Sequence, residues 1–464
     1  MTDPSSPSPA ASRPVGIVGT GYVGLVTGLA LAELGHRVVC LDVDRAKVAA
    51  LQAGRAPFHE PGVDDLLVRH AGAVMFTTEP AQVFGPCPVV FVTVDTPPGP
   101  GGDADLSRVE AVVATIPAGT ELVMVMKSTV PAGTGRRITR HLRATGRHSV
   151  RYVSNPEFLR EGSAVHDVLH PERVVLGADN SDAAEAVAAL WEPLGAPVVA
   201  CDVASAEMVK LAANAFLATK ISFVNEIANV CDAVGADVAT VARGMGLDSR
   251  IGAAFLNPGI GYGGSCFPKD VAALKQLAGN SGYHFQLLSA VIEVNELQKR
   301  RIVVHLADRL GQLQGARIAL LGLAFKPGTD DLREASSLVL AARLAAEGAS
   351  LVVHDPVVGD QALDALPAGT VKVARAADAL AGADAAIVVT EWPEYLDLVH
   401  PALASSMARP LLVDGRNLID PDAAASAGFE WVGVGRPDCL PDALGALRLV
   451  LDNDAAAPAP VAGC

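Results

Sequence analysis

The chain has 464 residues, of which 50% are hydrophobic and 19% are charged, so its length suggests about three domains and its composition is globular. Its formal net charge of −15 argues against a nucleic-acid partner, because such proteins present a basic surface to phosphates. No apolar run is long enough to span a bilayer, so we expect no membrane partner either.

Both ends of the chain have a composition typical of disorder. Residues 1–14 contain no apolar segment of the kind found in signal peptides, and residues 453–464 are of low complexity. Seven cysteines are scattered without a C-x-x-C pair, which is typical of a reducing compartment. These features predict a cytoplasmic protein with a disordered tail at each end.

The segment after the first tail has the pattern of a dinucleotide-binding unit. A short apolar strand, Val15–Val18, runs into Gly19, Gly21 and Gly24 with G-x-G-x-x-G spacing, and a helix follows. A second strand ends at Asp42, where an acidic residue can accept hydrogen bonds from an adenosine ribose. That acid disfavours the extra phosphate of NADP, so the pattern predicts NAD as cofactor. A βαβ turn without a ligand is the alternative.

Polar loops follow the next strands, at the carboxyl ends where such sheets bind ligands. "TELVMVMKSTV" ends in a loop with Thr129, a candidate for holding water or cofactor, although a plain strand-end threonine is the simpler interpretation. "VSNPEFLREGSAVHD" contributes Glu157 and Glu161, which are candidates for general acid–base work. Exposed carboxylates at a helix start are the alternative.

A long helix is predicted in the middle of the chain. Apolar residues recur at helical spacing through "SAEMVKLAANAFLATKISFVNEIANVCDAVGADV", and Ser205 is a plausible N-cap. Lys210 and Asn214 are four residues apart and therefore share one face. Buried, they suit stabilisation of an oxyanion and fixation of a hydroxyl or water. A solvated stripe on the helix edge is the alternative.

The stretch "GYGGSCFPKD" places one cysteine between a glycine-rich loop and a predicted helix. Cys266 precedes a helix N-terminus, whose dipole favours negative charge, and Lys269 adds a positive charge nearby. The pattern is typical of a reactive thiolate, although a buried structural cysteine is the alternative.

The last third of the chain repeats the first pattern in a degenerate form. It has strand, glycine loop, helix, and a strand ending at Asp355, with Lys326 in the loop as a phosphate-binding candidate. An α/β scaffold with no ligand of its own is the alternative. We therefore predict an α/β fold of two Rossmann-like doubly wound domains joined by a long central helix, with a cleft between them. The expected boundaries are 15–200 for the NAD domain, 201–300 for the central helical region with the cysteine loop, and 301–452 for the second domain.

An NAD domain combined with a thiolate predicts a four-electron oxidation. Hydride transfer turns an alcohol into an aldehyde, and the thiolate adds to the aldehyde to form a thiohemiacetal. Loss of a second hydride gives a thioester that water hydrolyses. The sequence contains no G-x-S-x-G or H-E-x-x-H motif and no His/Cys cluster, so hydrolase and metal-dependent functions have no support and we expect no metal.

From about Val15 to about Leu451 the chain resembles the UDP-glucose 6-dehydrogenase family of nucleotide-sugar dehydrogenases. The resemblance rests on "GTGYVG", "KSTVP", "NPEFLREG", "KLAANAFLATKISFVNE", "GYGGSCFPKD" and "LLGLAFKPGTDDLREASS" in this order.

The resemblance implies the following residue roles. The catalytic group comprises the nucleophile Cys266, Asp270 assisting it or its water, Lys210 and Asn214 at the C6 oxygen, Glu157 as acid–base, and Thr129 holding water. The implied NAD-binding residues are Gly19, Gly21, Tyr22, Val23, Gly24, Asp42, Lys47, Thr96, Thr129, Glu161, Lys269 and Arg333. The implied UDP-sugar-binding residues are Glu157, Phe158, Leu159, Glu161, Lys210, Asn214, Arg250, Phe255, Leu256, Tyr262, Gly263, Phe325, Lys326 and Arg416.

The resemblance also implies a homodimer formed through the central helix, in which Arg250 reaches the neighbouring subunit's site. GDP-mannose 6-dehydrogenase is the nearest alternative because it shares this chemistry. A one-hydride hydroxyacid dehydrogenase would have no use for Cys266. A non-catalytic NAD or nucleotide-sugar sensor could also dispense with that cysteine.

Overall fold

The computed structural model describes residues 14–99 and 101–436 of the chain. Contacts divide the chain into two compact units, each of which is described by itself. Unit 1 is Met1–Ala213 with Ala272–His284, and unit 2 is Asn214–Val271 with Phe285–Cys464. The predicted tails, 1–14 and 453–464, lie outside the described residues except for Pro14.

Unit 1 is built on an eight-stranded sheet with strand order β3-β2-β1-β4-β5-β6-β7-β8. Its strands are β1 (Val15–Val18), β2 (Val38–Leu41), β3 (Val74–Thr77), β4 (Val89–Val92), β5 (Leu122–Met126), β6 (Val150–Ser154), β7 (Val174–Ala178) and β8 (Val198–Cys201). All neighbouring strands are parallel except β6 and β7. The first six follow the order of dinucleotide-binding folds, which places the ends of β1 and β4 at the topological switch point.

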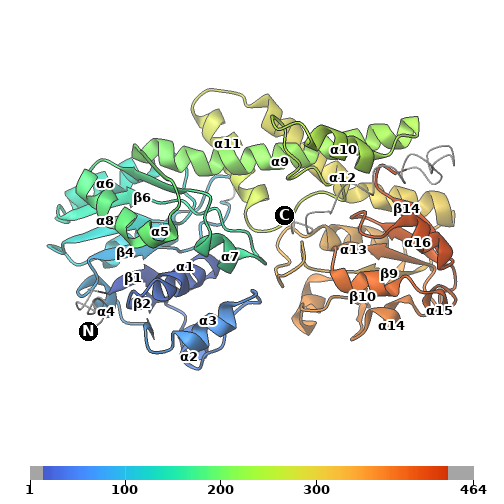
Figure 1. The fold of residues 1–464 in the computed structure, drawn as a ribbon, viewed down its shortest axis with the longest axis horizontal. Coiled ribbons are helices and arrows are strands. Elements are labelled where there is room, and N and C mark those ends of the chain that lie inside the picture. The colour runs from blue at the N-terminus through green and yellow to red at the C-terminus, as the bar shows by residue number, and fades with distance from the viewer. Residues whose placement is uncertain (1–13, 100, 437–464) are drawn as a thin grey trace, which may run out of the picture. The chain divides into compact units, whose positions relative to one another are not determined.

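Helices cover both faces of this sheet (Figure 1). They are α1 (Tyr22–Glu33), α2 (Arg45–Gln52), α3 (Val63–Arg69), α4 (Ala81–Phe84), α5 (Ser107–Thr115), α6 (Thr134–Ala144), α7 (Ala164–Leu169) and α8 (Ser181–Trp191), with a 3-10 turn η1 (Glu192–Leu194). Two separate apolar cores result: one holds Leu25 of α1 and Leu66 of α3, and the other holds Val109 of α5 and Ile138 of α6. Burial on both faces explains why the central strands are apolar throughout.

Unit 2 contains a six-stranded parallel sheet with order β11-β10-β9-β12-β13-β14. Its strands are β9 (Arg317–Leu321), β10 (Ser350–His354), β11 (Val371–Lys372), β12 (Ala385–Val388), β13 (Leu411–Asp414) and β14 (Glu430–Gly433). This order repeats that of the first six strands of unit 1. The prediction of two Rossmann-like domains and of a degenerate internal copy is therefore confirmed.

The helices of unit 2 lie on both faces of its sheet (Figure 1), and the buried apolar side chains form a core on each face. They are α10 (Val238–Gly246), α12 (Gln286–Leu310), α13 (Ser336–Ala346), α14 (Ala376–Leu380), α15 (Pro401–Ala404) and α16 (Pro421–Ser426), with 3-10 turns η2 (Asp360–Ala365) and η3 (Pro393–Leu398). Helices α9 (Val203–Val234) and α11 (Phe267–Asn280) each contribute residues to both units.

The predicted central helix is α9, but its expected N-cap is wrong. The helix begins at Val203, so Ser205 lies in its first turn. Asp202 takes the capping position, because its Oδ1 accepts the Ser205 amide at 3.0 Å. A carboxylate at the N-cap accepts an otherwise unsatisfied amide and also complements the helix dipole, so it outcompetes the serine.

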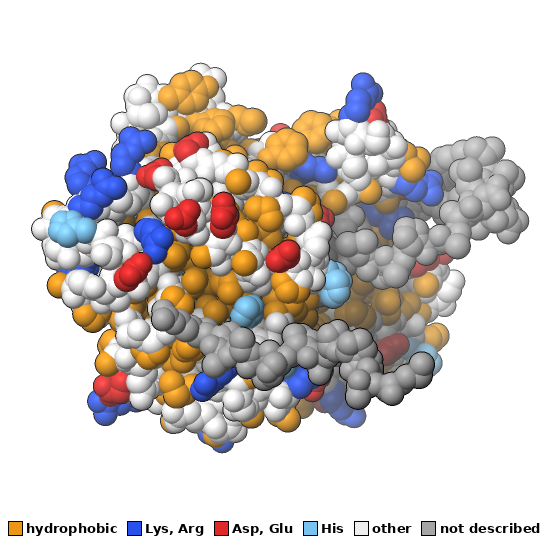
Figure 2. Space-filling view, turned by 60° about the vertical axis from the view of Figure 1, so that its left-hand side comes forward, with side chains coloured by type: hydrophobic (Ala, Val, Ile, Leu, Met, Phe, Trp, Pro, Cys, Tyr) orange, Lys and Arg blue, Asp and Glu red, His pale blue; other side chains and the backbone are white. Residues whose placement is uncertain are grey.

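The surface carries charges of both signs. On the face seen in Figure 2, Lys and Arg side chains stand singly or in small groups, with acidic, apolar and uncharged groups between them. Across residues 14–99 and 101–436, no helix combines the length and apolar character that a membrane crossing requires.

Candidate active site

The loop between β1 and α1 forms a cradle that only glycine permits. Gly19 has a φ of +97°, and a Cβ on Gly24 would lie 1.9 Å from the Gly19 carbonyl oxygen. At Gly21, by contrast, a Cβ would meet nothing nearer than an Asp95 oxygen at 3.9 Å. The backbone at the start of α1 is therefore open to close approach, which suits a pyrophosphate at a helix N-terminus. The loop fits the dinucleotide predicted for it, and Val23 lies in the first turn of α1.

Asp42 stands at the end of β2, next to this loop. Its Oδ2 accepts the Thr20 amide at 2.8 Å and the ammonium of Lys47 at 3.2 Å, while Oδ1 accepts the Asp44 amide at 3.0 Å. Burial alone would raise the pKa of Asp42, but the Asp44 and Thr20 donors outweigh it and lower the pKa. The group is therefore an anion at neutral pH. Its Oδ2 also accepts the Thr20 hydroxyl at 2.7 Å, whereas Oδ1 accepts the Asp44 amide and keeps a second acceptor position for a ribose hydroxyl.

A buried ion pair joins the loop after β6 to α9 within unit 1. Lys210 is 3% exposed, and its Nζ lies 2.9 Å from Oε1 of Glu157, which is 5% exposed. Glu157 Oε2 also accepts the Leu159 amide at 2.6 Å. Burial would raise the pKa of Glu157, but the charge and hydrogen bond of Lys210 lower it below its ordinary value. The structure thus brings together two residues that the sequence placed 53 positions apart.

Lys127 is a second buried cation near this pair, and sequence reasoning missed its role. Its Nζ donates to Asn155 Oδ1 at 3.2 Å and lies 5.3 Å from the centre of the Trp191 ring. Burial lowers its pKa to about 8, although the charge of Glu157 acts in the opposite direction. Because Asn155 also donates to the Val175 carbonyl, Lys127 helps to fix the chain that leads into Glu157.

Phe158 is held between two cations. The Arg173 guanidinium lies 3.6 Å from the centre of the ring, and the Lys210 ammonium lies 5.6 Å from it. Both distances are within the range of cation–π attraction. Arg173 was not predicted for the site, and the only sequence signal is its place in "HPERVVLG", just before β7.

The predicted residues on the neighbouring loops also lie near the carboxyl ends of the strands. Thr96 donates its hydroxyl to the Thr129 carbonyl at 2.8 Å, so the loops after β4 and β5 are joined. Glu161 is buried, whereas Leu159 is partly exposed. These positions are those expected for ligand-binding loops of a parallel sheet.

In unit 2 the predicted nucleophile stands where the sequence placed it. Cys266 is half-buried and directly precedes α11, whose first-turn Asp270 amide donates to the Cys266 carbonyl at 2.8 Å. The Asp270 carboxylate is 1% exposed and accepts from Asn214 at 2.6 Å and from Lys269 at 2.7 Å. Asn214, Lys269 and Asp270 therefore form one hydrogen-bonded cluster beside the helix start.

The glycine loop before Cys266 is fixed by buried amide side chains that sequence reasoning missed. Asn295 of α12 accepts the Tyr262 amide at 2.8 Å and donates to the Tyr262 carbonyl at 3.1 Å. Asn225 of α9 accepts the Gly259 amide at 2.8 Å, and Gln298 donates to the Gly259 carbonyl at 2.8 Å. Their sequence signal is a polar residue on an otherwise apolar helix face, which also occurs at helix edges.

We expect Asn295→Ala to loosen this loop, because both main-chain groups of Tyr262 lose their partner inside the protein. Each buried polar group left without a partner costs about 1–3 kcal/mol, so the free energy of unfolding should fall by about 2–4 kcal/mol. Urea unfolding measures it, with Asn280→Ala at the exposed end of α11 as the control. Equal stability of the two variants would contradict the assignment of Asn295 as the residue that holds the loop.

Three aromatic rings surround the start of α11. Phe267 makes edge contacts with Tyr262, at 5.8 Å between ring centres, and with Phe255, at 6.1 Å. Phe255 has a φ of +64°, which is rare for a side chain of this size. Leu256 beside it is buried. Such strained backbone persists only where its surroundings enforce it.

The loop after β9, which contains Phe325 and Glu334, contacts the glycine loop before Cys266. A Cβ on Gly263 would lie 2.2 Å from the Glu334 carbonyl oxygen, and one on Gly264 would lie 2.7 Å from the Phe325 ring. Lys326 is buried, with its ammonium 5.6 Å from the Phe325 ring centre. Glycine at both positions is therefore a packing requirement, and at Gly264, where φ is +86°, it is also a conformational one.

The guanidinium of Arg416, which was predicted to bind the UDP-sugar, has several partners inside the protein. Its guanidinium donates to the carbonyls of Gly261 at 3.0 Å and Val389 at 2.9 Å, and it lies 3.3 Å from Glu391. It thus ties the glycine loop to the end of β12. Any contact with a ligand must use the remaining N–H groups, of which a guanidinium has five in all.

Two predicted arginines have exposed side chains, although the Arg333 carbonyl accepts the Gly264 amide at 2.9 Å. Arg250 is 87% exposed and pairs with Asp248 at 2.6 Å, and Arg333 is 61% exposed and pairs with Asp331 at 2.7 Å. Within unit 2, neither belongs to the hydrogen-bonded cluster around Asp270.

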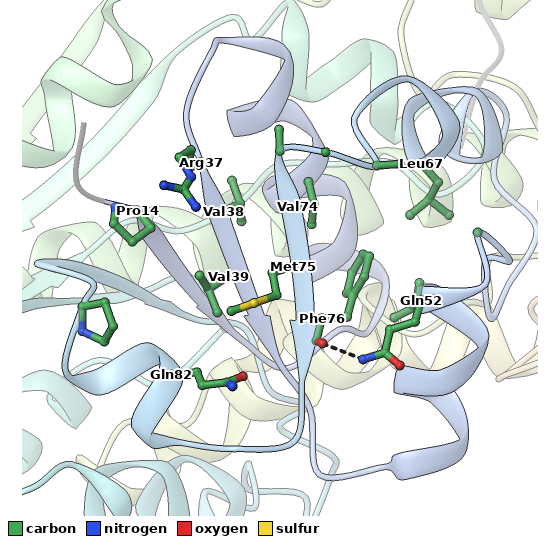
Figure 3. A pocket seen from close by; sticks show the side chains of 16 residues that line it. Pro14, Arg37, Val38, Val39, Gln52, Leu67, Val74, Met75, Phe76 and Gln82 are labelled. Atoms are coloured by element: carbon green, nitrogen blue, oxygen red, sulfur yellow. Dashed lines mark hydrogen bonds between the residues drawn. The ribbon is translucent and has the colours of Figure 1, made fainter. Parts of the chain in front are cut away.

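A hollow of about 690 Å³ lies elsewhere, beside the edge strand β3 (Figure 3). Its lining includes Val39 of β2, together with Met75 and Phe76 of β3. Gln52 donates to the Phe76 carbonyl at 2.9 Å across it. None of the residues predicted for the site lines this hollow, so it is separate from the groups described above.

The fold and these residues define a class: an NAD-dependent oxidoreductase with two nucleotide-type domains and a cysteine at a helix start. Within the described part of the chain, no cluster of three or more His, Cys, Asp or Glu side chains is arranged to hold a metal ion. The chain belongs to the UDP-glucose/GDP-mannose dehydrogenase family. The NAD binding domain of that family matches residues 13–195, its central domain matches 204–297, and its UDP binding domain matches 319–421.

Individual relatives agree with this membership. A UDP-glucose 6-dehydrogenase of Bacillus subtilis is 44% identical over 433 residues, which are 92% of this chain and 98% of that protein. One from Pseudomonas aeruginosa is 44% identical over 442 residues, 91% of this chain and 97% of that protein. The structure of a UDP-glucose dehydrogenase from the archaeon Pyrobaculum islandicum matches with a TM-score of 0.85 at 36% identity, covering 92% of this chain and 99% of that one.

Proposed function

We propose that this protein oxidises UDP-glucose to UDP-glucuronate, with two NAD consumed for each sugar. The observation that carries the proposal is the position of Cys266 at the start of α11, since only the second oxidation requires a nucleophile there. Relatives named as UDP-glucose 6-dehydrogenases support this substrate over GDP-mannose. We assign NAD to residues 15–200, the cysteine loop to 201–300 and the UDP-sugar to 301–452.

In the first oxidation, Lys210 and Asn214 handle the C6 hydroxyl of the sugar. The Lys210 ammonium stabilises negative charge that develops on the oxygen, while the Asn214 amide fixes its direction. The glycine loop and Asp42 would hold NAD, which would supply the hydride acceptor for each oxidation at C6. Glu157, kept ionised by its pairing with Lys210, orients that ammonium and can accept the hydroxyl proton through it or through a water.

In the second oxidation, the sulfur of Cys266 is covalently bonded to C6 of the sugar. Its thiolate adds to the aldehyde carbon, and the oxygen takes a proton, which gives a thiohemiacetal. Loss of hydride from that carbon and of the proton from its oxygen leaves a thioester. Water, held by Thr129 and activated by Asp270 or Glu157, adds to the thioester, and the sulfur leaves as thiolate with UDP-glucuronate as the acid.

Counting NADH against sugar tests this function. UDP-glucose, GDP-mannose and UDP-N-acetylmannosamine are supplied separately with NAD, and NADH absorbance is compared with the sugar consumed. We expect two NADH from each UDP-glucose and little turnover of the other two. One NADH per sugar would falsify the double oxidation. Faster turnover of GDP-mannose than of UDP-glucose would make GDP-mannose the assigned substrate. No NADH from any of the three sugars would favour a non-catalytic sensor.

We also propose a homodimer formed through α9. On the part of α9 in unit 2, Phe216, Phe223, Val230 and Val234 are exposed by 65%, 50%, 56% and 70%. Their spacing of seven, seven and four residues places them along one stripe of the helix. A two-fold axis across this stripe would bury it against its own copy, which is the commonest arrangement of soluble oligomers. The same dimer is what places Arg250 at the neighbouring subunit's site.

A charge in the stripe tests the dimer. Phe223→Asp should convert the dimer into a monomer at micromolar concentration, measured by sedimentation, because an unpaired carboxylate would be buried in the interface. Leu247→Asp is the matched control, since Leu247 is 83% exposed and lies after α10. A wild-type chain that sediments as a monomer would exclude the dimer.

A cytoplasmic location is proposed on chemical grounds. Cys40, Cys87, Cys201 and Cys231 are free thiols, as expected for a protein kept in a reducing compartment, and the NAD it consumes is an intracellular cofactor.

A further inference from the structure

The buried carboxylate of Glu60 joins two segments of unit 1 that both belong to the candidate site. Glu60 is 5% exposed and lies between α2 and α3. Its Oε2 accepts from the Tyr22 hydroxyl and from the Gly162 amide at 2.5 Å, and its Oε1 accepts the Ala164 amide at 2.7 Å. Tyr22 begins α1 inside the nucleotide loop, whereas Gly162 directly follows Glu161.

Tyr22 is held firmly in this arrangement. Its hydroxyl oxygen accepts the Gly162 amide at 2.9 Å and lies 3.5 Å from the Arg160 carbonyl, and its ring lies 5.0 Å from that of Phe58. Burial raises the pKa of Tyr22 well above its ordinary value, and the charge of Glu60 adds to the effect. The phenol therefore stays protonated and remains the donor to Glu60 throughout the working pH range.

We propose that Glu60 and Tyr22 are positioning residues that couple dinucleotide binding to the arrangement of the 157–162 segment. That segment carries Glu157 and Glu161, and its end is fastened to the first residue of α1 through Glu60. A dinucleotide that orders the glycine loop thereby also orders the two carboxylates. The proposal rests on the proposed function for its catalytic consequence, but the coupling itself is a property of NAD binding alone.

The chain contains a matched control for this arrangement. Glu207 is also a buried carboxylate of unit 1, and it accepts the Gly133 amide at 2.6 Å and the Gly135 amide at 2.7 Å. The Tyr152 hydroxyl lies 3.4 Å from it. One carboxylate, two amides and one phenol are thus repeated at the start of α6, and none of these hydrogen bonds involves a residue of the nucleotide loop or of the 157–162 segment.

The test compares Tyr22→Phe and Glu60→Gln with Tyr152→Phe and Glu207→Gln in the full-length protein. Hydrogen–deuterium exchange is followed on peptides covering 157–164 with and without NAD, and no sugar is present. In the wild type we expect NAD to slow exchange there at least about threefold, and in Tyr22→Phe and Glu60→Gln we expect that slowing to be lost. The two control variants should keep it, although their melting temperatures fall.

Kinetics with saturating UDP-glucose give the catalytic consequence. We expect kcat/KM for NAD to fall at least about tenfold in each of the two single variants. The double variant should have about the same kcat/KM for NAD as the less active single variant, because both changes remove one connected unit.

Each outcome decides the matter. Preserved NAD-dependent protection in Tyr22→Phe, additive losses in the double variant, or an equal loss in Tyr152→Phe would each overturn the coupling. Should Glu60→Gln fail to fold, Tyr22→Phe alone decides, since it removes one oxygen and leaves the carboxylate in place. Wild-type protein that binds NAD but makes no NADH with UDP-glucose would overturn the proposed function and leave the exchange result to judge the coupling.

Discussion

Cys266→Ser is expected to lower the rate of UDP-glucuronate formation by at least about a thousandfold while UDP-glucose affinity stays within about threefold. Cys266 stands at the N-terminus of α11, where the helix dipole favours an anion. A serine hydroxyl at the same place keeps nearly the same shape but is a far weaker acid, so little nucleophile forms at neutral pH. Because the change concerns only the covalent step, binding should survive it.

Two measurements separate chemistry from binding in this variant. NADH formation gives the rate, and titration calorimetry gives the affinity for UDP-glucose. Cys201→Ser is the matched control, because Cys201 is a free thiol of intermediate exposure at the end of β8 with no assigned role. Wild-type turnover in Cys266→Ser would remove the thioester from the mechanism. An equal loss of turnover in Cys201→Ser would mean that the loss in Cys266→Ser is no evidence for a nucleophile.

Lys210→Met is expected to lower both stability and activity. The change leaves the Glu157 carboxylate, 5% exposed, without the ammonium that lies 2.9 Å from it. Breaking a buried pair by removing one partner typically costs about 3–5 kcal/mol of unfolding free energy. Urea unfolding at neutral pH measures that cost. The double variant Glu157→Gln/Lys210→Met should recover a large part of the stability, because no charge is then left buried.

The pH dependence of Lys210→Met provides an independent check. In the wild type the pKa of Glu157 is lowered, so the pair stabilises the fold above the ordinary carboxyl pKa of about 4.3 and this contribution is lost as pH falls through the lower, folded-state value. In the variant, burial is no longer opposed by Lys210, so the pKa should rise and the carboxyl should protonate on folding. The stability gap between the two proteins should therefore narrow as the pH falls from 7 towards 4. A gap that stays constant over this range would contradict the pairing.

Several elements followed directly from local sequence. The loop Gly19–Gly24 was predicted from its glycines. Gly19 has a positive φ, and a side chain at Gly24 would collide with the Gly19 carbonyl oxygen, so both positions require glycine. The helix start after Cys266 followed from the glycine-rich loop before it, and α9 followed from apolar residues at helical spacing. The N-cap of α9 was predicted wrongly as Ser205, because a serine before an apolar periodic run is a common cap and nothing local showed that the Asp202 carboxylate would take that position.

The contacts that hold the candidate site together were decided by the tertiary structure. Asn295 reaches Tyr262 from 33 positions away, Glu60 reaches Gly162 from 102, and Arg416 reaches Gly261 from 155. Each of these side chains sits in a stretch whose own pattern indicates only a helix face or a loop. Its partner is fixed by which strands lie side by side in the sheet, and that order depends on the whole chain.

The sequence by itself therefore determined the kind of protein: two dinucleotide-type domains, a long helix, and a cysteine directly before a helix start. The tertiary structure decided which charges meet, as in the pair of Lys210 and Glu157 and in the contacts of Glu60 with Tyr22. The physical reason is that backbone conformation is governed by near neighbours, whereas a buried charge is tolerated only where the completed fold supplies its partner.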